Sequence, residues 1–341
     1  MKKRFIILCI AMIFLSGCKK YSLEANELKQ INFVLDYSIN PNHVGIFVAD
    51  KLGYFNDEGI KVNILKGPDN GADLVVASKS ADFGISYQDS LALNYSSDNP
   101  LPVIAVSSII AHNDSGLISL SKSNIKNPKD MENHTYATWN MEVEKMIIYD
   151  LMKSNGSDYN KLKILPFEAT NVLASLNSGA DLVWVYYYVD GIILNMKNID
   201  FNYIKLIDYK KEYDYYTPLI IGNNEFIEKN PIITKKFLKA LKKGYMYAMD
   251  NPKESAKILH SYAKELDIKY LEESLEYLKD KWIDKDFLEE GFGYIDEKRW
   301  NLFFEFLYKN NIISKDITKE KYFTNDFLDW FIINKNYLCK K

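Results

Sequence analysis

The sequence has very little arginine: only Arg4 and Arg299 occur among its 341 residues. The formal net charge is -3, with lysines and acidic residues interspersed, so we expect no basic surface for a nucleic acid. Several catalytic signatures are also missing, namely a GxSxG nucleophile elbow, an HExxH motif and a glycine loop for phosphate. The sequence therefore disfavours nucleic-acid binding and catalysis, and a bound anion would lack the arginine fork that usually meets it.

The three cysteines are too few for a disulfide framework, a CxxC redox pair or a zinc site. Two of them lie in an N-terminal segment, where a basic start at 2–4 precedes an apolar run from Phe5 and the sequence LSGC at 15–18. This layout is typical of a secretory signal, and the run is shorter than the roughly 20 apolar residues of a membrane span. LSGC resembles the bacterial lipobox, which implies cleavage after residue 17 and a lipid on Cys18.

We therefore expect a lipoprotein signal peptide at 1–17 and a polar tether at 18–30. The mature protein would be extracytoplasmic, held at the cell membrane by its lipid, on the periplasmic side or the outer surface. The alternative is an ordinary secretory signal in which the cysteine stands by chance.

Beyond the tether, short apolar runs alternate with segments of helical spacing, which is typical of an α/β protein. Strands are expected at 31–35, 60–65, 82–85 and 103–107, then at 135–138, 162–165, 182–185 and 203–206. A run at 117–120 predicts a crossing strand, and one at 217–221 returns the chain to a mostly helical remainder. We expect two α/β lobes joined by a two-strand hinge, with lobe 1 at 31–116 and 223–335 and lobe 2 at 117–222.

A cleft between two such lobes is faced by the carboxyl ends of the strands, so the ligand is expected at the loops that follow them. Aromatic, acidic and amide side chains gather in these loops. The candidate ligand-binding residues are Asp36, Tyr37, Asn42, His43, Ser86, Tyr87, Ser107, Trp139, Asn140, Trp184, Tyr187, Asp190, Tyr215 and Tyr216. They suit a flat, neutral or weakly cationic heteroaromatic ring, because aromatic faces stack and carboxylates accept from ring amino groups.

Other interpretations stay open. The chain has 25 tyrosines, so single tyrosines and Trp184 can be packing residues, and Asp190 can simply begin a helix. His43, His112 and His134 fall near strand ends and can form a zinc site, although the dense spacing of metal ligands is missing. Carboxylates in a cleft can also do acid–base chemistry, and a surface adhesin can keep such a fold without a pocket. We expect a monomeric binding protein without metal or cofactor.

The sequence after residue 32 carries a resemblance to a known family. It reads FVLDYSINPNHVGIFVADKLGYFNDEGIKVNI, with further matches at ASKSADFGIS, WVYYYVDGI and DYYTPLIIGNNEFIEKNP. These strings resemble the solute-binding proteins that deliver thiamine pyrimidine precursors to ABC transporters, a family that includes the fungal pyrimidine synthase and riboflavin-binding relatives. The resemblance covers about residues 31 to 310. It implies a type II periplasmic-binding-protein fold, hydroxymethylpyrimidine or formylaminopyrimidine as the ligand, and an ABC permease and ATPase as partners.

Some positions depart from the family. In the fungal synthase a lysine that holds pyridoxal phosphate and a histidine that is consumed stand where this sequence has Ser86 and Ser90. A cysteine-rich cluster of that enzyme corresponds to residues 211–216, which contain no cysteine. The resemblance therefore implies capture by lobe closure and not pyrimidine synthesis. Tyr37 stands where many relatives have tryptophan, so riboflavin, another small heteroaromatic or a sulfonate remains an alternative ligand.

Overall fold

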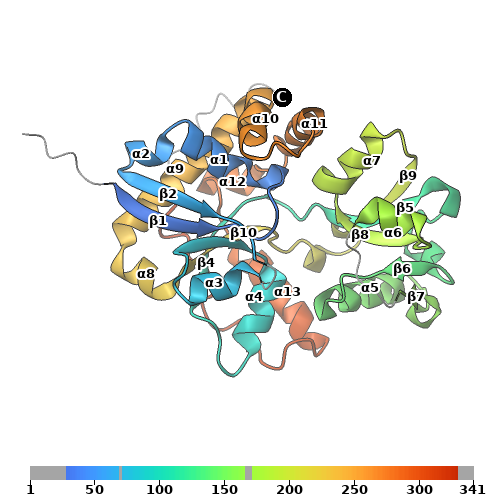
Figure 1. Ribbon diagram of the computed structural model, residues 1–341. Helices are drawn as coiled ribbons and strands as arrows, with labels where there is room; N and C mark the ends of the chain where they lie inside the picture. Colours follow the sequence, from blue (N-terminus) through green and yellow to red (C-terminus); the bar gives the residue numbers. More distant parts are fainter. Residues whose placement is uncertain (1–27, 69–70, 166–170, 329–341) are drawn as a thin grey trace, which may run out of the picture.

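The computed structural model describes residues 28–68, 71–165 and 171–328, which form two α/β lobes side by side (Figure 1). Each lobe is built on one five-stranded sheet. The first sheet has the order β2-β1-β3-β10-β4, from β1 (Lys29–Val34), β2 (Ile60–Leu65), β3 (Phe83–Ser86), β4 (Val103–Ser108) and β10 (Leu219–Asn223). The second has the order β7-β6-β8-β5-β9, from β5 (Ser115–Leu120), β6 (Thr135–Ala137), β7 (Lys163–Ile164), β8 (Leu182–Tyr186) and β9 (Phe201–Lys205). The expected two-lobe α/β class is confirmed, whereas the signal peptide and Cys18 lie outside the described residues.

One strand in each sheet runs against its neighbours. β10 lies between β3 and β4 and is antiparallel to both, and β5 lies between β8 and β9 and is antiparallel to both. The prediction that 117–120 crosses between the lobes is therefore wrong. These residues belong to β5, whose first five residues are buried, so their apolar character reflects a central strand and not a connection.

Helices cover both faces of the first sheet. Ile31 and Phe33 of β1 pack with α1 (Val44–Lys51) and α9 (Pro231–Asp250), whereas Val34 packs with residues of α3 (Ala72–Ala77) and α4 (Gln88–Ser96). This split follows the alternation of side chains along a strand. The other helices of this lobe are α2 (Tyr54–Asp57), α8 (Asn224–Lys229), α10 (Pro252–Tyr262), α11 (Ile268–Leu278), α12 (Lys285–Glu290) and α13 (Glu297–Lys309).

The second lobe carries its own set of helices. They are α5 (Glu142–Ser154), α6 (Val172–Asn177), the π-helical turn η5 (Tyr187–Gly191) and α7 (Ile192–Met196). α11 reaches across from the first lobe and packs against η5 and α7 (Figure 1). In the described part of the chain, no helix is long and apolar enough to cross a membrane.

Two segments connect the lobes: residues 109–114 between β4 and β5, and residues 214–218 before β10. A charged cluster joins them to the helical region. His112 of the first segment lies 2.7 Å from Asp214 of the second and 3.1 Å from Asp284, which caps α12. Arg299 of α13 donates to the Asp214 carbonyl at 2.8 Å. The hydrogen bonds that His112 donates to Asp214 and Asp284 raise its pKa to about 9, so this ring is protonated at neutral pH.

We expect this cluster to make stability depend on pH. Because the pKa of His112 is higher in the folded protein than its ordinary value of 6.5, its contribution to stability is complete below that value and is lost as the pH rises through about 9. The free energy of unfolding should therefore differ more between wild type and His112→Gln at pH 6 than at pH 10. Urea denaturation of both proteins at both pH values measures this difference. Asp284→Asn removes one of the two charges that pair with His112, so it should also reduce the stability that His112 contributes at pH 6. A His112→Gln effect that is the same at both pH values would contradict the assignment.

Candidate functional site

Three polar side chains meet at the carboxyl ends of β1 and β3. Oδ1 of Asp36 lies 2.7 Å from Nε2 of His43, and the Tyr87 hydroxyl donates to Oδ2 of the same carboxylate. The side chain of Asp36 is 4% exposed and that of His43 is 0% exposed. Burial alone would raise the pKa of Asp36, but His43 and Tyr87 outweigh it and hold this pKa below its ordinary value. Asp36 is therefore an ionised carboxylate with both oxygens engaged.

The local sequence NPNH orients His43. Asn40 caps the short helix η1 (Pro41–His43): its side-chain oxygen accepts from the Asn42 backbone, and its backbone N–H donates to His43 Nδ1 at 3.3 Å. Because Nδ1 accepts this bond, the ring directs a proton on Nε2 toward Asp36. Tyr245 of α9 stabilises η1, because its hydroxyl donates to the Asn42 carbonyl at 2.7 Å.

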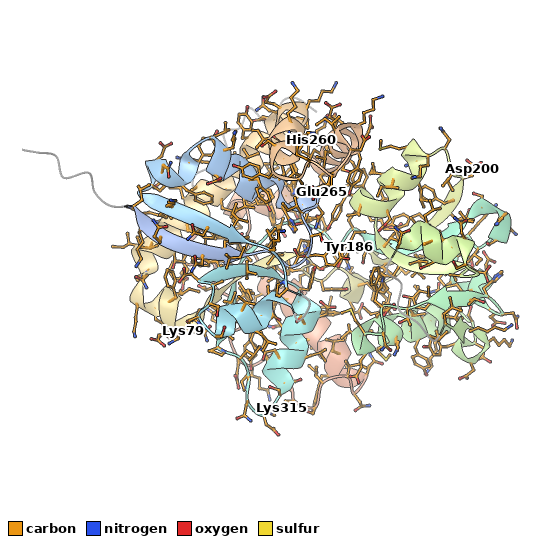
Figure 2. The ribbon with its side chains drawn as sticks, in the orientation of Figure 1. Lys79, Tyr186, Asp200, His260, Glu265 and Lys315 are labelled. Carbon is orange, nitrogen blue, oxygen red and sulfur yellow. The ribbon has the colours of Figure 1, made fainter. Side chains whose placement is uncertain are left out.

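The second lobe contributes two tyrosines from the end of β8 and the start of η5. Asn42 Nδ2 of the first lobe donates to the Tyr188 hydroxyl of the second lobe at 3.2 Å. The Tyr186 hydroxyl lies 2.8 Å from Thr217 Oγ1, and the Tyr186 and Tyr188 ring centroids are 5.7 Å apart. Figure 2 shows Tyr186 between the two lobes. Burial raises the pKa of both phenols above the ordinary value, so both stay protonated at neutral pH.

The two candidate tryptophans contact each other instead of this group. Trp139 Nε1 donates to the Trp184 carbonyl at 3.0 Å. Trp184 is 6% exposed within β8, whereas Trp139 is 37% exposed. Among the described residues, neither indole has a ring contact or hydrogen bond with Asp36 or Tyr87. The neighbouring Asn140 accepts a hydrogen bond from a lysine of α5 at 2.6 Å.

Three candidate tyrosines make packing contacts. Tyr215 stacks on Phe303 of α13, with ring centroids 4.2 Å apart. The guanidinium carbon of Arg299 lies over the Tyr216 ring, 3.8 Å from the ring centroid. The Tyr187 ring lies against other tyrosine rings, one of them with a centroid 4.9 Å away. The structure therefore places these three rings among other side chains and not beside Asp36.

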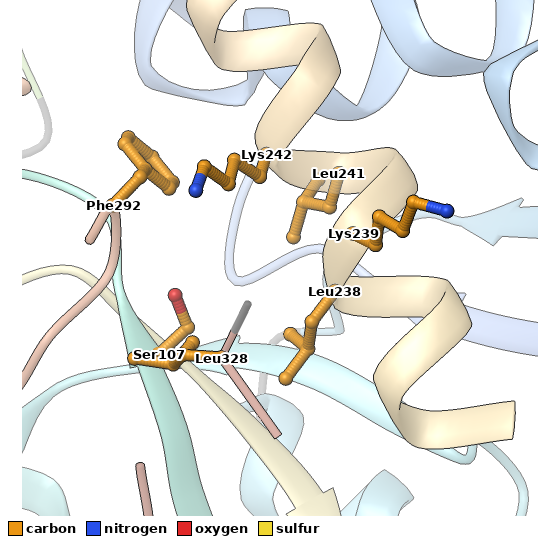
Figure 3. Close-up of a pocket in the computed structure, with 7 residues that line it drawn as sticks. All are labelled: Ser107, Leu238, Lys239, Leu241, Lys242, Phe292 and Leu328. Atoms are coloured by element: carbon orange, nitrogen blue, oxygen red, sulfur yellow. The ribbon is translucent and has the colours of Figure 1, made fainter. Parts of the chain in front are cut away.

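The remaining candidates are scattered. Tyr37 is 64% exposed, and Ser86 is buried at the end of β3. Asp190 has no hydrogen-bond partner among the described residues, and burial raises its pKa to about 7. A small hollow between β4 and α9 is lined by Ser107, Leu238, Lys239, Leu241, Lys242, Phe292 and Leu328 (Figure 3). Ser107 is the only candidate residue on that lining.

The histidines do not come together. His43 pairs with Asp36, His112 with Asp214 and Asp284, and His134 with a carboxylate of the second lobe. Within residues 28–68, 71–165 and 171–328, no group of histidine, cysteine and acidic side chains is arranged to hold a metal ion. The zinc interpretation therefore has no support in this part of the chain.

Sequence reasoning passed over Tyr186 and Tyr188 in favour of Tyr187. Tyr186 is the last residue of β8, but Tyr188 already belongs to the π-helical turn η5, so strand alternation does not predict that the two lie together. Only their contacts to Thr217 and Asn42 reveal it. Asp89, at the start of α4, was also left out of the candidates although it is 7% exposed.

Comparison with known proteins gives relatives of two kinds. The chain is 26% identical over 332 residues to a formylaminopyrimidine-binding protein of Halalkalibacterium halodurans, an alignment that covers 94% of this chain and 98% of the relative. It is 25% identical over 317 residues to a 4-amino-5-hydroxymethyl-2-methylpyrimidine phosphate synthase of Candida albicans, covering 88% of each chain.

Solved structures share the fold at low identity. The alkanesulfonate-binding protein SsuA of Xanthomonas axonopodis bound to MOPS has a TM-score of 0.64 at 10% identity, covering 87% of this chain and 99% of that one. The nitrate-binding protein NrtA of Synechocystis has a TM-score of 0.67 at 12% identity, covering 88% and 87%. These similarities show a periplasmic-binding-protein fold. The profile of the family described as NMT1/THI5 like matches residues 40–255, and the chain therefore belongs to the NMT1/THI5-like family.

Proposed function

We propose that this protein is the extracytoplasmic binding component of an ABC importer, anchored by a lipid on Cys18, and that it captures a thiamine pyrimidine precursor such as hydroxymethylpyrimidine or formylaminopyrimidine. The observation that carries the proposal is the paired arrangement of Asp36, His43 and Tyr87 on one lobe with Tyr186 and Tyr188 on the other. The formylaminopyrimidine-binding relative, aligned over almost the whole chain, supports the ligand class.

Binding would occur by closure of the lobes around a flat ring. Tyr186 is half-buried and offers an aromatic face, worth about 0.5 to 1.5 kcal/mol per stacked pair beyond area burial. Tyr188 is 2% exposed in this arrangement and would offer its face only once the lobes open. The Asn42–Tyr188 hydrogen bond already spans the cleft, so a ligand that preserves or replaces it would favour the closed arrangement. Asp190 is a further acceptor on the second lobe, because its carboxyl has no partner among the described residues.

An anionic ligand of the kind named for the sulfonate- and nitrate-binding structures is a weaker proposal. Arg299 is the only arginine of this chain besides Arg4. Its guanidinium lies over Tyr216 and its Nε donates to the Asp214 carbonyl, so it is committed to packing near the hinge. Asp36, moreover, is an ionised carboxylate within the proposed site and would repel an anion.

Synthesis of the pyrimidine is also less well supported than its binding. The synthase relatives align over much of the chain, but Ser86 and Ser90 stand where the resemblance places the reactive lysine and histidine. Ser90 is engaged as well, since its hydroxyl donates to Asp73 at 2.6 Å.

Isothermal titration calorimetry tests the proposal. We expect 1:1 binding of 4-amino-5-hydroxymethyl-2-methylpyrimidine or of formylaminopyrimidine at micromolar or tighter affinity, equivalent to roughly 8 kcal/mol. Riboflavin and an alkanesulfonate serve as alternative ligands, and mass spectrometry of the incubated mixture detects any turnover. Absence of binding to both pyrimidines by the folded protein would refute the proposal.

Tyr188→Ala should weaken pyrimidine binding by roughly 5- to 100-fold, because it removes a stacking face and buried apolar surface. The same titration measures the effect. Tyr149→Ala, which removes a 37% exposed tyrosine from α5 of the same lobe, is the matched control and should bind like wild type. Equal affinities for wild type and Tyr188→Ala would place the ligand elsewhere.

A further inference from the structure

Asp89 is a buried acid with an oxygen that nothing in the described structure satisfies. It lies in the first turn of α4, two residues after Tyr87, and is 7% exposed. Its Oδ1 is buried and has no hydrogen-bond partner among the described residues. Asp36 differs, because His43 and Tyr87 engage both of its oxygens. Of these two carboxylates on the first lobe, Asp89 is the one with a free acceptor.

The groups around Asp89 cannot supply the missing donor. Tyr186 of the second lobe and Tyr215 are close enough for Asp89 to raise the pKa of each, but the Tyr186 hydroxyl is engaged with Thr217 and the Tyr215 hydroxyl with Asn113. Asp73 of α3 is a like charge and accepts a hydrogen bond from the Ser90 hydroxyl. Burial raises the pKa of Asp89 to about 6, opposed by the backbone N–H groups of the α4 terminus. Asp89 is thus mostly ionised at neutral pH.

A buried acceptor without a donor calls for an explanation, and a ligand donor supplies one. Asp89 follows Gln88, whose backbone N–H donates to the Tyr216 carbonyl at 3.0 Å and whose side-chain oxygen accepts from the Tyr216 backbone at 2.8 Å. Because Tyr216 lies in the segment 214–218 that connects the lobes, this start of α4 adjoins the space where the lobes meet. We propose that Oδ1 of Asp89 accepts a hydrogen bond from the amino group of the bound heterocycle, and so selects amino-substituted over oxo-substituted rings. This inference rests on the proposed function, because it names the ring substituent that the same site would recognise.

The selectivity follows from the polarity of the two substituents. An amino group donates to a carboxylate, whereas an oxo group at the same ring position presents a second acceptor to it. A site built on a buried polar group rejects a ring that cannot pair with it, because that group is then left without a partner.

Binding of two probes to the full-length protein tests the role of Asp89. The probes are 4-amino-5-hydroxymethyl-2-methylpyrimidine and its 4-oxo counterpart. Wild type should prefer the amino ring, and Asp89→Asn should lower affinity for that ring by about 10- to 100-fold, since a charged hydrogen bond is lost. The amide of the variant can donate, so its affinity for the oxo ring should stay level or rise. Asp73→Asn removes a neighbouring charge that already accepts a hydrogen bond from Ser90, and it should keep the wild-type preference.

The outcomes separate this inference from the proposed function. If wild type binds neither ring, the proposed function fails. If wild type binds the amino ring and Asp89→Asn binds it with equal affinity and preference, only the role of Asp89 fails, and its oxygen is satisfied by water.

A pH series gives a second readout that does not require Asp89→Asn to fold. Asp190, whose pKa burial raises to about 7, titrates in the same range, so the series is run on Asp190→Asn as well as on wild type. The affinity of both proteins for the amino ring should fall between pH 7.5 and 5, as Asp89 becomes protonated, by more than titration of the free ligand accounts for. If protonation of the free ligand alone accounts for the pH dependence of the binding affinity, the proposal is wrong.

Discussion

Gly244→Val is expected to lower the free energy of unfolding by about 3 kcal/mol, because it forces apart two helices that touch through their backbones. Gly244 lies in α9, and a Cβ at this position would stand 2.0 Å from the carbonyl oxygen of Gly45 in α1. The obstacle is backbone within a helix, so no rotamer change relieves it. Urea denaturation measures the loss, which should lower the melting temperature by roughly 6 to 12 °C.

The same substitution should weaken ligand binding. A Cβ at Gly45 would lie 2.3 Å from the Tyr245 ring, so that ring packs directly on the α1 backbone. Tyr245 in turn holds the Asn42 carbonyl, and moving it displaces the turn that positions His43. Lys236→Val places the same side chain at a half-buried position of α9 and serves as the control. If both variants lose equal stability, the effect comes from valine in a helix and not from the helix contact.

Much of the architecture could be predicted because it depends on local patterns. The apolar runs at 31–35, 60–65 and 182–185 are strands in the structure, each within one or two residues. The run at 117–120 was assigned to a connection because an antiparallel strand inserted between two others leaves no local mark in the sequence. Its place in the sheet is set by pairing with β8 and β9, more than 60 residues away along the chain.

The site was harder to predict because a side chain's role depends on its partners. The sequence pointed to Asp36 as an acceptor and not to Asp89, but Tyr87 and His43 engage the first and nothing described engages Oδ1 of the second. Tyr215 was a reasonable candidate from the sequence, but in the structure its ring stacks on Phe303, which lies 88 positions later in the chain. Such pairings are tertiary contacts, which composition and spacing do not encode.

His43→Leu should have the second large effect. It replaces the imidazole with an apolar side chain of similar size and so removes the Nε2 donor from Asp36, whose side chain is 4% exposed. A buried carboxylate that loses its main partner costs about 3 kcal/mol of stability. The pKa of Asp36 should rise in the variant, because burial then dominates over the remaining bond from Tyr87. Urea denaturation and titration of the Asp36 carboxyl by NMR measure the two effects.

The double variant Asp36→Asn/His43→Leu decides whether charge is the cause. If the penalty of His43→Leu comes from an unpaired carboxylate, neutralising Asp36 should restore part of the lost stability, so the double variant should be more stable than His43→Leu alone. The pH dependence has the same sign. The lowered pKa of Asp36 adds stability above its ordinary value of 3.8, and this stability is lost as the pH falls through the pKa of the folded protein. The difference between wild type and His43→Leu should therefore shrink in acid. If the double variant is less stable than His43→Leu, His43 acts through packing and the Asp36 carboxylate does not organise this end of the cleft.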